Sequence, residues 1–448
     1  MLRRAHATGC DAVSATRLAN LLPDLRWRGL VHDVTDGLEG RLATNEPIRA
    51  YNGFDPTFRS LHVGHLVPIY GLMRLQRAGG QPVALVGGAT GLIGDPSGRA
   101  NERPLLDRAA VQVNVHAIRD QLARFLDFAA GPTQALVVNN LDWLGEARLL
   151  DFLRDVGKHF TVPYMLDKES VQARLAKGLS FTEFSYMLLQ AADFAHLRRS
   201  HGVELQCGGA DQWGNITAGL ELIRRTARPG DGAREHAHGL AYPLLLSPSG
   251  AKFGKSESGD SIWLDPSLTS PYRYYQYWLE ADDRDVGLYL RWFTMFDRGR
   301  IEELEADHAA APERRVAQRV LARDVTELTH GRAAAERVGR VSEILFGGDP
   351  TRADAQTLAD LAAEIPAAPW PEGGEAIDVV SLLVATGASS SRGDARRVVE
   401  QGGVHVNGAP VRDAAATFTA DDLLAGRYLL VRRGKRDQRI LVRGQGRA

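Results

Sequence analysis

The sequence predicts a doubly wound α/β fold, in which helices cover both faces of a parallel sheet. Two observations support this prediction. Between residues 45 and 246, short and continuously apolar segments alternate with amphipathic ones, as strands and helices alternate in such a fold. Glycine-rich turns also follow the apolar segments, where each strand would pass into a helix. We therefore expect one large α/β domain, followed by smaller ones.

The elements of this domain can be placed in order along the chain. A short strand, Ile48–Tyr51, should lead into a helix that begins at Leu66 and ends near Ala78–Gly80, where glycine can form the C-cap. Further strands are expected in the apolar segments Gln81–Val86 and Ala135–Val138, and a last strand with its turn is expected at Leu205–Trp213. Leu240–Leu246 is also apolar, but the alternation stops before it. Further helices are expected at Leu105–Phe128, Leu149–Arg199 and Asn215–Arg225.

Composition shifts give the domain boundaries. We expect an N-terminal extension and helix (1–44), the α/β domain (45–246) with a helical insertion (about 145–204), a loop (247–262), an α-helical domain (263–346), a linker (347–375) and a small α+β domain (376–448). The linker is assigned because the stretch is rich in Pro, Gly, Ala and Asp.

The composition is that of an ordinary globular protein: 448 residues, 44% apolar, 24% charged, with a net charge of −1. Any contact with nucleic acid must therefore come from local patches. Two cysteines, Cys10 and Cys207, stand far apart without metal-ligand spacing, so we expect no metal site and a reducing, cytoplasmic location. No apolar run approaches the ~20 residues that span a membrane. Residues 1–22 read as an organellar presequence or a disordered start, and we favour the second interpretation.

The stretch Tyr51–His65 has the features of a nucleotide-binding turn. It runs from a strand end through Gly53 and Gly64 to the start of a helix, where unpaired N–H groups and the helix dipole favour phosphate. His62 and His65 flank that helix start and can donate to phosphate. Alternatively the histidines only cap the helix, which we expect for one of the two.

Two later segments could complete a phosphate site. The glycine-rich loop Gly87–Gly98 is followed by Arg99 and Arg103, and Lys252-Phe-Gly-Lys-Ser256 lies in a polar loop with no core positions. Lysines on a loop can stabilise a charged leaving group. The alternatives are a structural turn and a solvated loop, and the histidine turn is what favours the functional interpretation.

Carboxylates border the same part of the predicted sheet. Asp95 and Asp211 follow predicted strands, and Tyr186, Gln190 and Asp193 share one face of a helix at i, i+4 and i+7. Apolar residues surround this polar trio in the sequence, so it should be buried and paired. A solvated stripe is the alternative. A ligand with an amino group and a hydroxyl would satisfy the trio.

These motifs together resemble those of class I aminoacyl-tRNA synthetases, and the long stretches resemble bacterial-type tyrosyl-tRNA synthetases closely. The matching stretches are Tyr51–Thr57, His62–His65, Ala84–Gly98, Phe181–Met187, Gly208–Asn215 and Lys252–Ser256. The resemblance covers about residues 25–440. It implies a Rossmann-like catalytic domain, an α-helical tRNA-contacting domain and an S4-like RNA-binding domain.

Position by position, the resemblance implies a role for each site residue. Tyrosine would be bound by Tyr51 and Asp193 at its hydroxyl, by Asp95, Tyr186 and Gln190 at its ammonium group, and by Gln212 near its carboxylate. ATP would be bound by Gly53, Asp55, Thr57, His62, Gly64, His65, Gly209, Asp211 and Lys255. Catalytic charge stabilisation would come from Thr57, His62, His65, Arg99, Arg103, Lys252, Lys255 and Ser256. Asn52, Arg99 and Phe253-Gly254 depart from the usual pattern without removing a required group.

The end of the chain resembles an S4 RNA-binding fold over Ser391–Gly408. From Arg392 onward there are twelve Lys and Arg against six Asp and Glu, a local positive excess that suits RNA. The residues expected to contact RNA are Arg392, Arg396, Arg397 and Asn407.

The resemblance implies a two-step reaction. ATP, with its Mg²⁺, would be a substrate and no permanent cofactor would be needed; tyrosine would be activated and passed to tRNA-Tyr by a homodimer joined through the helical insertion. Three alternatives remain. A tryptophan enzyme is disfavoured by Tyr51, Asp193 and the S4-like end, and a catalytically inactive RNA-binding paralogue by the intact histidines and lysines. A dinucleotide-dependent oxidoreductase is disfavoured because the GxGxxG fingerprint is absent.

Overall fold

The computed structural model describes residues 17–95, 97, 106–168, 171–172, 175, 178–227, 237–244, 261–371, 374–434 and 437–444. The chain divides into two compact units, residues 1–268 with 282–317 and residues 269–281 with 318–448. Of residues 1–22, which were expected to form a disordered start, residues 1–16 lie outside the described part. None of the helices in that part has the length and apolar character that a membrane crossing requires.

A six-stranded sheet forms the centre of the first unit. Its strands, in the order β1-β6-β5-β2-β3-β4, are β1 (Asp33–Val34), β6 (His238–Tyr242), β5 (Leu205–Gly209), β2 (Arg49–Phe54), β3 (Gln81–Val86) and β4 (Leu136–Asn139). All neighbours are parallel except β1, which is antiparallel to β6. The doubly wound prediction is confirmed for five strands. The chain order reverses between β2 and β5, so their C-terminal ends flank the crevice where such folds bind ligands.

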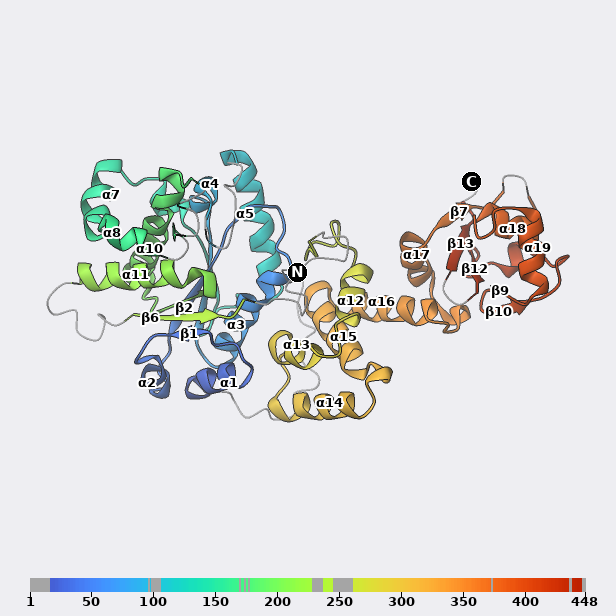
Figure 1. Cartoon of the computed structure of the whole chain (residues 1–448), viewed down its shortest axis with the longest axis horizontal. Coiled ribbons are helices and arrows are strands. Elements are labelled where there is room, and N and C mark those ends of the chain that lie inside the picture. Colours follow the sequence, from blue (N-terminus) through green and yellow to red (C-terminus); the bar gives the residue numbers. More distant parts are fainter. Residues whose placement is uncertain are drawn as a thin grey trace. The chain divides into compact units, whose positions relative to one another are not determined.

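Helices cover both faces of this sheet (Figure 1). The longer helices of this unit are α1 (Leu21–Trp27), α2 (Leu38–Ala43), α3 (Leu66–Arg77), α5 (Arg108–Leu122), α10 (Phe181–His201) and α11 (Trp213–Thr226), together with α13 (Val286–Phe293), which packs on α3, and α14 (Arg298–Ala310), which packs on α13. Shorter ones are η2 (Val63–His65), α4 (Thr90–Ile93), α6 (Leu141–Leu144), α7 (Leu149–Asp155), α8 (Val162–Leu166) and η4 (Ala210–Gln212). The helix predicted from Leu66 ends as expected, with Gly79 in the left-handed region at φ 98°.

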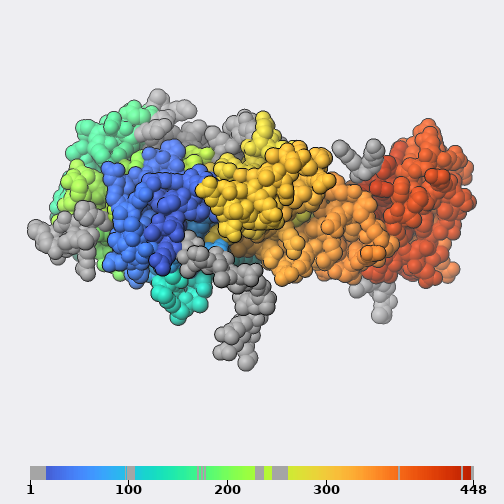
Figure 2. Space-filling model, turned by 90° about the horizontal axis from the view of Figure 1, so that it is seen from below, coloured from blue at the N-terminus to red at the C-terminus, as the bar shows by residue number. Residues whose placement is uncertain are grey.

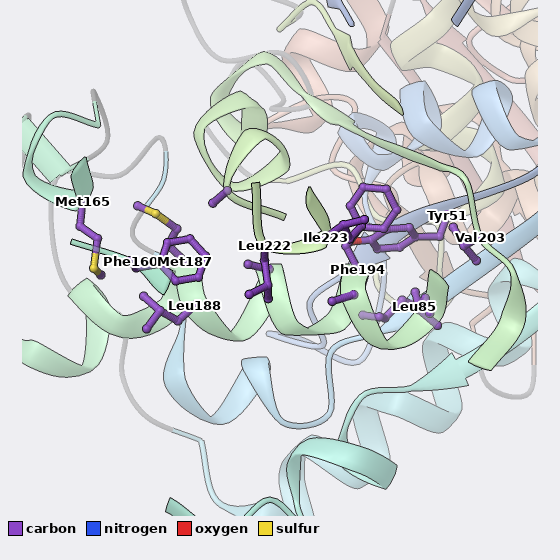
Figure 3. Packing of buried hydrophobic residues seen from close by; sticks show 14 of the residues in the cluster. Tyr51, Leu85, Phe160, Met165, Met187, Leu188, Phe194, Val203, Leu222 and Ile223 are labelled. Carbon is purple, nitrogen blue, oxygen red and sulfur yellow. The ribbon is translucent and has the colours of Figure 1, made fainter. Parts of the chain in front are cut away.

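The long helix α10 carries the apolar core on one side of the sheet. Met187, Leu188 and Phe194 of α10 pack with residues of β2, β3, α8 and α11. Figure 3 shows this cluster, with Tyr51 lying beside Phe194 near one end and Met165 at the other. Because Tyr186 and Asp193 are buried on the same helix, its polar residues are held among apolar neighbours, as the sequence predicted.

Helix α13 is fixed to the first unit by two arginines that bind carbonyls at and just beyond its C-terminal end. Arg74 of α3 donates through Nη2 to the carbonyl oxygens of Arg291, Trp292 and Thr294, at 2.9 to 3.0 Å. Arg28 donates to the carbonyl of Arg291 at 2.8 Å. These guanidinium groups satisfy carbonyls that have no partner within the helix. Figure 2 shows the yellow surface of this segment against the blue N-terminal surface.

The second unit is an α/β arrangement around a five-stranded sheet of order β10-β9-β12-β13-β7. Its strands are β7 (Ala367–Pro369), β9 (Val404–Val406), β10 (Ala409–Val411), β12 (Tyr428–Arg433) and β13 (Asp437–Val442), with β8 (Ala376–Asp378) and β11 (Thr417–Thr419) as a separate pair. Its helices are α12 (Pro271–Leu279), α15 (Val316–His330), α16 (Arg332–Leu345), α17 (Ala355–Glu364), α18 (Val379–Ala385) and α19 (Arg392–Glu400).

The stretch expected to be a linker, 347–375, contributes to this second unit. It contains α17 and β7, and β7 pairs in parallel with β13. Leu358 and Leu361 of α17 are fully buried against the sheet. Because alanine surrounds these two leucines in the sequence, their i, i+3 spacing gave little helical signal, and composition alone suggested a linker. The helices expected as one domain, 263–346, are likewise divided between the two units.

Candidate active site

The turn after β2 forms a helix start in which both histidines act as caps. The N–H of Gly64 donates to Nδ1 of His62, and the N–H of His62 donates to Nδ1 of His65, each at 3.1 Å. The prediction that only one histidine caps the helix was therefore wrong. Capping is compatible with the phosphate contact that the sequence predicted for these histidines. Because each Nδ1 accepts a hydrogen bond, a neutral ring would carry its proton on Nε2, and that atom would be a donor suited to phosphate oxygen.

Gly64 is required in this turn for a reason that the sequence did not reveal. A Cβ atom at this position would lie 2.8 Å from the His62 ring, closer than such contacts allow. Glycine thus gives room to the capping imidazole, in addition to any room it leaves for phosphate. The His62 and His65 rings lie 4.1 Å apart between centroids, so the two side chains form one unit at the N-terminus of α3.

A buried hydroxyl and a buried carboxylate form the other end of the site. Tyr51 and Asp193 are each 2% exposed. Asn140 Nδ2 donates to Asp193 Oδ2 at 2.9 Å and Trp143 Nε1 donates to Oδ1 at 2.8 Å. The Oη of Tyr51 has no hydrogen-bond partner among the described residues. Burial, and to a smaller extent the charge of Asp193, raises the pKa of Tyr51 well above its usual value. The hydroxyl therefore keeps its proton and can donate it to an acceptor on a ligand.

Burial raises the pKa of Asp193 from 3.8 to about 7, against the two donors that lower it. In the unfolded chain the carboxylate ionises near pH ~4. Between about pH 4 and pH 7 the folded state therefore binds the extra proton, and stability falls as pH rises through this window. From about pH 4 to pH 7 the ligand-free wild type should lose up to roughly 4 kcal/mol of unfolding free energy that Asp193→Asn keeps. Each pH unit in this window contributes about 1.4 kcal/mol. Urea unfolding at pH 4.5, 6 and 7.5 would measure this; parallel curves for both proteins would contradict it.

Between these two ends lies a hydrogen-bonded cluster of carboxylates and amides. Tyr186 Oη donates to Asp55 Oδ2 at 3.0 Å, and Thr90 Oγ1 donates to Asp55 Oδ1 at 3.1 Å. Gln212 Nε2 donates to Asp95 Oδ2 at 2.7 Å. Asp55 was expected among the ATP ligands, yet its contacts place it with the residues expected to hold the ammonium group. The charges of Asp55 and Asp95 both help to raise the pKa of Tyr186, after burial, so a cation would be favoured beside these two carboxylates.

A second amide chain extends this cluster. Asn215 Nδ2 donates to Gln190 Oε1 at 3.0 Å and to Gln212 Oε1 at 3.2 Å. The three side chains come from α10, η4 and α11, so the polar face of α10 is tied to the turn after β5. Gly209 ends β5, and Asp211 lies in that same turn. The predicted ribose contacts thus stand at the C-terminal end of β5, at the crevice.

Gly87 allows the cluster to assemble. A Cβ atom there would lie 2.3 Å from Thr90 Oγ1 and 2.4 Å from Asp55 Oδ1. Any larger residue would displace the hydrogen-bonded side chains of Thr90 and Asp55. Asp95, further along the same loop, accepts the N–H of Ser97 at 2.8 Å.

The remaining predicted phosphate residues divide into two groups. Thr57 is exposed just after β2, with its N–H bonded to the carbonyl of Asp55 at 2.9 Å. Arg99, Arg103, Lys252, Lys255 and Ser256 lie outside the described residues. Among the residues that are described, no group of three or more His, Cys, Asp or Glu side chains could hold a metal ion.

Asn140 and Trp143 were not predicted as site residues, although a signal was present. Both belong to the stretch that follows β4 at its C-terminal end, where ligands collect in open sheets. Residue type gave no reason to join either one to Asp193, some fifty positions later in the chain. Thr90 and Asn215 were missed for the same reason, since each serves a partner on another element.

The S4-like helix α19 presents the expected arginines. Arg392, Arg396 and Arg397 are exposed, and Arg397 is paired with Asp394 at 3.0 Å. An open groove of about 820 Å³ beside the helix start is lined by Ser391, Asp394, Arg397, Arg433 and Arg439, among others. This is the face that the sequence predicted to contact RNA, and its arginines lie beside the carboxylates of Asp394 and Asp437.

Asn407, which was predicted to contact RNA, has a structural role in this unit. It forms the two-residue turn between β9 and β10 with Gly408, at φ 50° and 85°. Its Nδ2 donates to the carbonyl of Asp422 at 2.7 Å, and its Oδ1 accepts the N–H of Leu430 at 3.0 Å. Both polar atoms of the side chain are therefore used within the fold.

Asn407→Ala should destabilise the second unit by about 1–3 kcal/mol, since it removes two hydrogen bonds and places a Cβ-bearing residue in the left-handed region. Asn407→Gly should lose less, because glycine accepts that conformation. Thermal unfolding of the two variants measures the difference. Equal losses would show that the side-chain bonds alone matter, and no loss in either would contradict the structural role.

Comparison with known proteins places this geometry in a family. The family "tRNA synthetases class I (W and Y)" matches residues 43–347, and "Tyrosine--tRNA ligase SYY-like C-terminal domain" matches residues 357–441. The tyrosine–tRNA ligase of Roseiflexus castenholzii is 49% identical over 429 residues, covering 95% of this chain and 99% of the relative. That of Geobacillus stearothermophilus is 49% identical over 419 residues, covering 93% and 98%.

Solved structures agree with this assignment. The C-terminally truncated mitochondrial tyrosyl-tRNA synthetase of Aspergillus nidulans is 30% identical, with a TM-score of 0.64, covering 73% of this chain and 94% of that one. A tryptophanyl-tRNA synthetase from Encephalitozoon cuniculi, 16% identical with a TM-score of 0.51, shares the fold alone. The dinucleotide-dependent oxidoreductase is thereby excluded, and the chain belongs to the class I aminoacyl-tRNA synthetases as a member of the tyrosine–tRNA ligase family.

Proposed function

We propose that the chain activates L-tyrosine with ATP to form tyrosyl-adenylate and then transfers the tyrosyl group to tRNA-Tyr. The observation that best supports this substrate is the pair formed by Tyr51 and Asp193. Tyr51 offers a buried donor without a partner in the described structure, and Asp193 is a buried acceptor. A phenol hydroxyl can accept from the first and donate to the second, which a phenylalanine ring cannot do.

The ammonium group of tyrosine fits the cluster of Asp55, Asp95, Tyr186 and Gln190. Asp95 is buried and keeps only one side-chain donor, Gln212, among the described residues that bond to it. An ammonium ion brings three donors and a positive charge, which compensates two carboxylates brought together in a pocket. Gln212, bonded to Asp95, then stands at the position proposed for the substrate carboxylate.

ATP is proposed to lie across the crevice, with its phosphates at the N-terminus of α3. Its ribose would meet Gly209 and Asp211 after β5, with Gly53 near the end of β2. The proposed phosphate ligands are Thr57, His62, Gly64 and His65, together with Arg99, Arg103, Lys252, Lys255 and Ser256 from segments outside the described residues. Mg²⁺ is proposed to arrive with the nucleotide and to offset its charge.

The first step is an in-line attack of the tyrosine carboxylate on the α-phosphate, which forms the mixed anhydride and releases pyrophosphate. The attacking carboxylate is already ionised, so no side chain needs to take a proton from it. The protein's contribution is to hold the two reactants in line and to stabilise the charge that gathers on the leaving group. In the second step a ribose hydroxyl at the end of tRNA-Tyr attacks the activated carbonyl and releases AMP.

A homodimer is proposed from an apolar surface on the helical insertion. Leu149 and Leu150 of α7 are 70% and 78% exposed, and Phe181 at the start of α10 is 79% exposed. Apolar side chains this exposed, on helices that share one core, suit burial against a second copy of the chain. Sedimentation of the wild type and of Leu150→Asp tests this, and a fully active wild-type monomer would contradict it.

The protein is expected to act in the cytoplasm.

Tyrosine-dependent exchange of pyrophosphate into ATP tests the proposed function. The wild type should catalyse exchange with L-tyrosine and only weakly with phenylalanine or tryptophan at equal concentrations. Charging of tRNA-Tyr with labelled tyrosine tests the second step. Exchange supported best by tryptophan, or by no amino acid, would refute the proposal.

A further inference from the structure

The described chain that resumes at residue 261, shortly after Lys252 and Lys255 in the sequence, pairs with the histidine turn. The N–H of Val63 donates to the carbonyl of Ile262 at 3.0 Å, and the N–H of Leu264 donates to the carbonyl of Leu61 at 2.8 Å. His62 and Trp263 form an antiparallel bridge between these bonds. Trp263 is thus held opposite His62 by backbone on both sides.

Aromatic contacts continue this backbone pairing. The Trp263 ring meets the His62 ring edge-on, with centroids 6.0 Å apart and planes at 71°. On another side it lies against Phe58, with centroids 4.7 Å apart. The imidazole of His62 is therefore in contact with Trp263 and with His65, while its Nδ1 is engaged by Gly64. These contacts leave the ring little freedom to rotate.

The two paired segments, which carry His62 and Trp263, are also held by helix α5. Gln121 of α5 accepts the N–H of Leu61 through Oε1 at 2.9 Å and donates to Ser60 Oγ at 3.0 Å. Ser60 Oγ also accepts the N–H of Asp265 at 3.1 Å. One buried hydroxyl thereby joins the histidine turn to the segment that carries Trp263.

We propose that Trp263 is a positioning residue for the activation step, acting through His62. Its indole fixes the orientation of the imidazole so that Nε2–H points toward the phosphate end of the crevice. This inference rests on the proposed function, because it takes His62 as a phosphate donor. Trp263 contacts the imidazole of His62 and the ring of Phe58. Removing its side chain should therefore lower the rate of activation and leave tyrosine binding unchanged.

Trp263→Leu tests this proposal, measured as the single-turnover rate of tyrosyl-adenylate formation. The rate should fall by about 10- to 100-fold, the size of effect expected when a reacting group is displaced by about 1 Å. The dissociation constant of tyrosine should stay within about twofold. Trp263→Phe, which keeps an aromatic edge, should recover most of the rate. Trp27→Leu is the matched control, since Trp27 of the same unit contacts Arg28, Arg291 and Arg298.

The decisive comparison is made in a His62→Ala background. If Trp263 acts through His62, adding Trp263→Leu to that variant should slow adenylate formation by less than about twofold. A full further loss would overturn the proposal and leave Trp263 as a general support of the fold. A wild type without tyrosine-dependent activity would refute the proposed function instead, so the two failures are distinguishable. Thermal unfolding of each variant ensures that the rates refer to folded protein.

Discussion

Asp193→Asn is expected to lower kcat/KM for tyrosine by about 10- to 100-fold while leaving that for phenylalanine nearly unchanged. The variant removes a charge-assisted hydrogen bond worth about 1.5–3 kcal/mol. It also introduces an NH₂ group into a position where Asn140 and Trp143 already donate, so one donor loses its acceptor. The measurement is pyrophosphate exchange with each amino acid.

Phenylalanine serves as the internal control in that experiment. A misfolded variant would lose activity with both amino acids, whereas the loss of hydroxyl recognition affects tyrosine alone. Asp142→Asn is the matched control, because Asp142 is exposed on the neighbouring helix α6. An unchanged ratio of tyrosine to phenylalanine in Asp193→Asn would show that another group recognises the hydroxyl.

His62→Asn is expected to slow tyrosyl-adenylate formation by about 100-fold or more, the usual cost of removing one donor to a developing charge. Asparagine is a favourable N-cap residue, so this variant should keep the bond from Gly64 and lose only the donor at Nε2. His62→Ala should show the same rate and an additional loss of about 0.5–2 kcal/mol in stability.

The affinity for tyrosine should be unchanged in both His62 variants. The residues proposed to hold tyrosine belong to β2, α10 and the turn after β5, whereas His62 contacts Gly64 and Trp263 at the start of α3. Equilibrium dialysis with labelled tyrosine and stopped-flow measurement of activation separate the two quantities. A loss of tyrosine affinity comparable with the loss of rate would contradict the assignment of His62 to the phosphate end.

Much of the fold was predictable because its signals are local. The apolar run Gln81–Val86 matches β3 at both ends, and the glycines after Leu66–Arg77 mark the end of α3. The two-residue strand β1 carries no such signal, since it is too short to show a pattern. Strand β7 and helix α17 were predicted to be part of a linker because their sequences, and the residues around them, are rich in alanine and proline.

The site was predictable in its members and not in its connections. Tyr186 and Asp193 could be joined from helical spacing alone. That Asp55 accepts from Tyr186, or that Asn140 and Trp143 hold Asp193, depends on pairings between distant elements. The capping of both histidines was missed because the choice between a cap and a ligand depends on backbone geometry, and in this turn the same residues can do both.

One strand and the turn after it are proposed to serve both reactants, with Tyr51 at the amino acid and His62 at the phosphates. A double-mutant cycle of Tyr51→Phe and His62→Asn, read as the rate of tyrosyl-adenylate formation at subsaturating tyrosine, tests it most directly. Tyr51→Phe alone should weaken tyrosine binding, and His62→Asn alone should slow the chemical step. If the two ends act separately, their free-energy effects should add to within about 0.5 kcal/mol. A coupling of 1 kcal/mol or more would contradict the account.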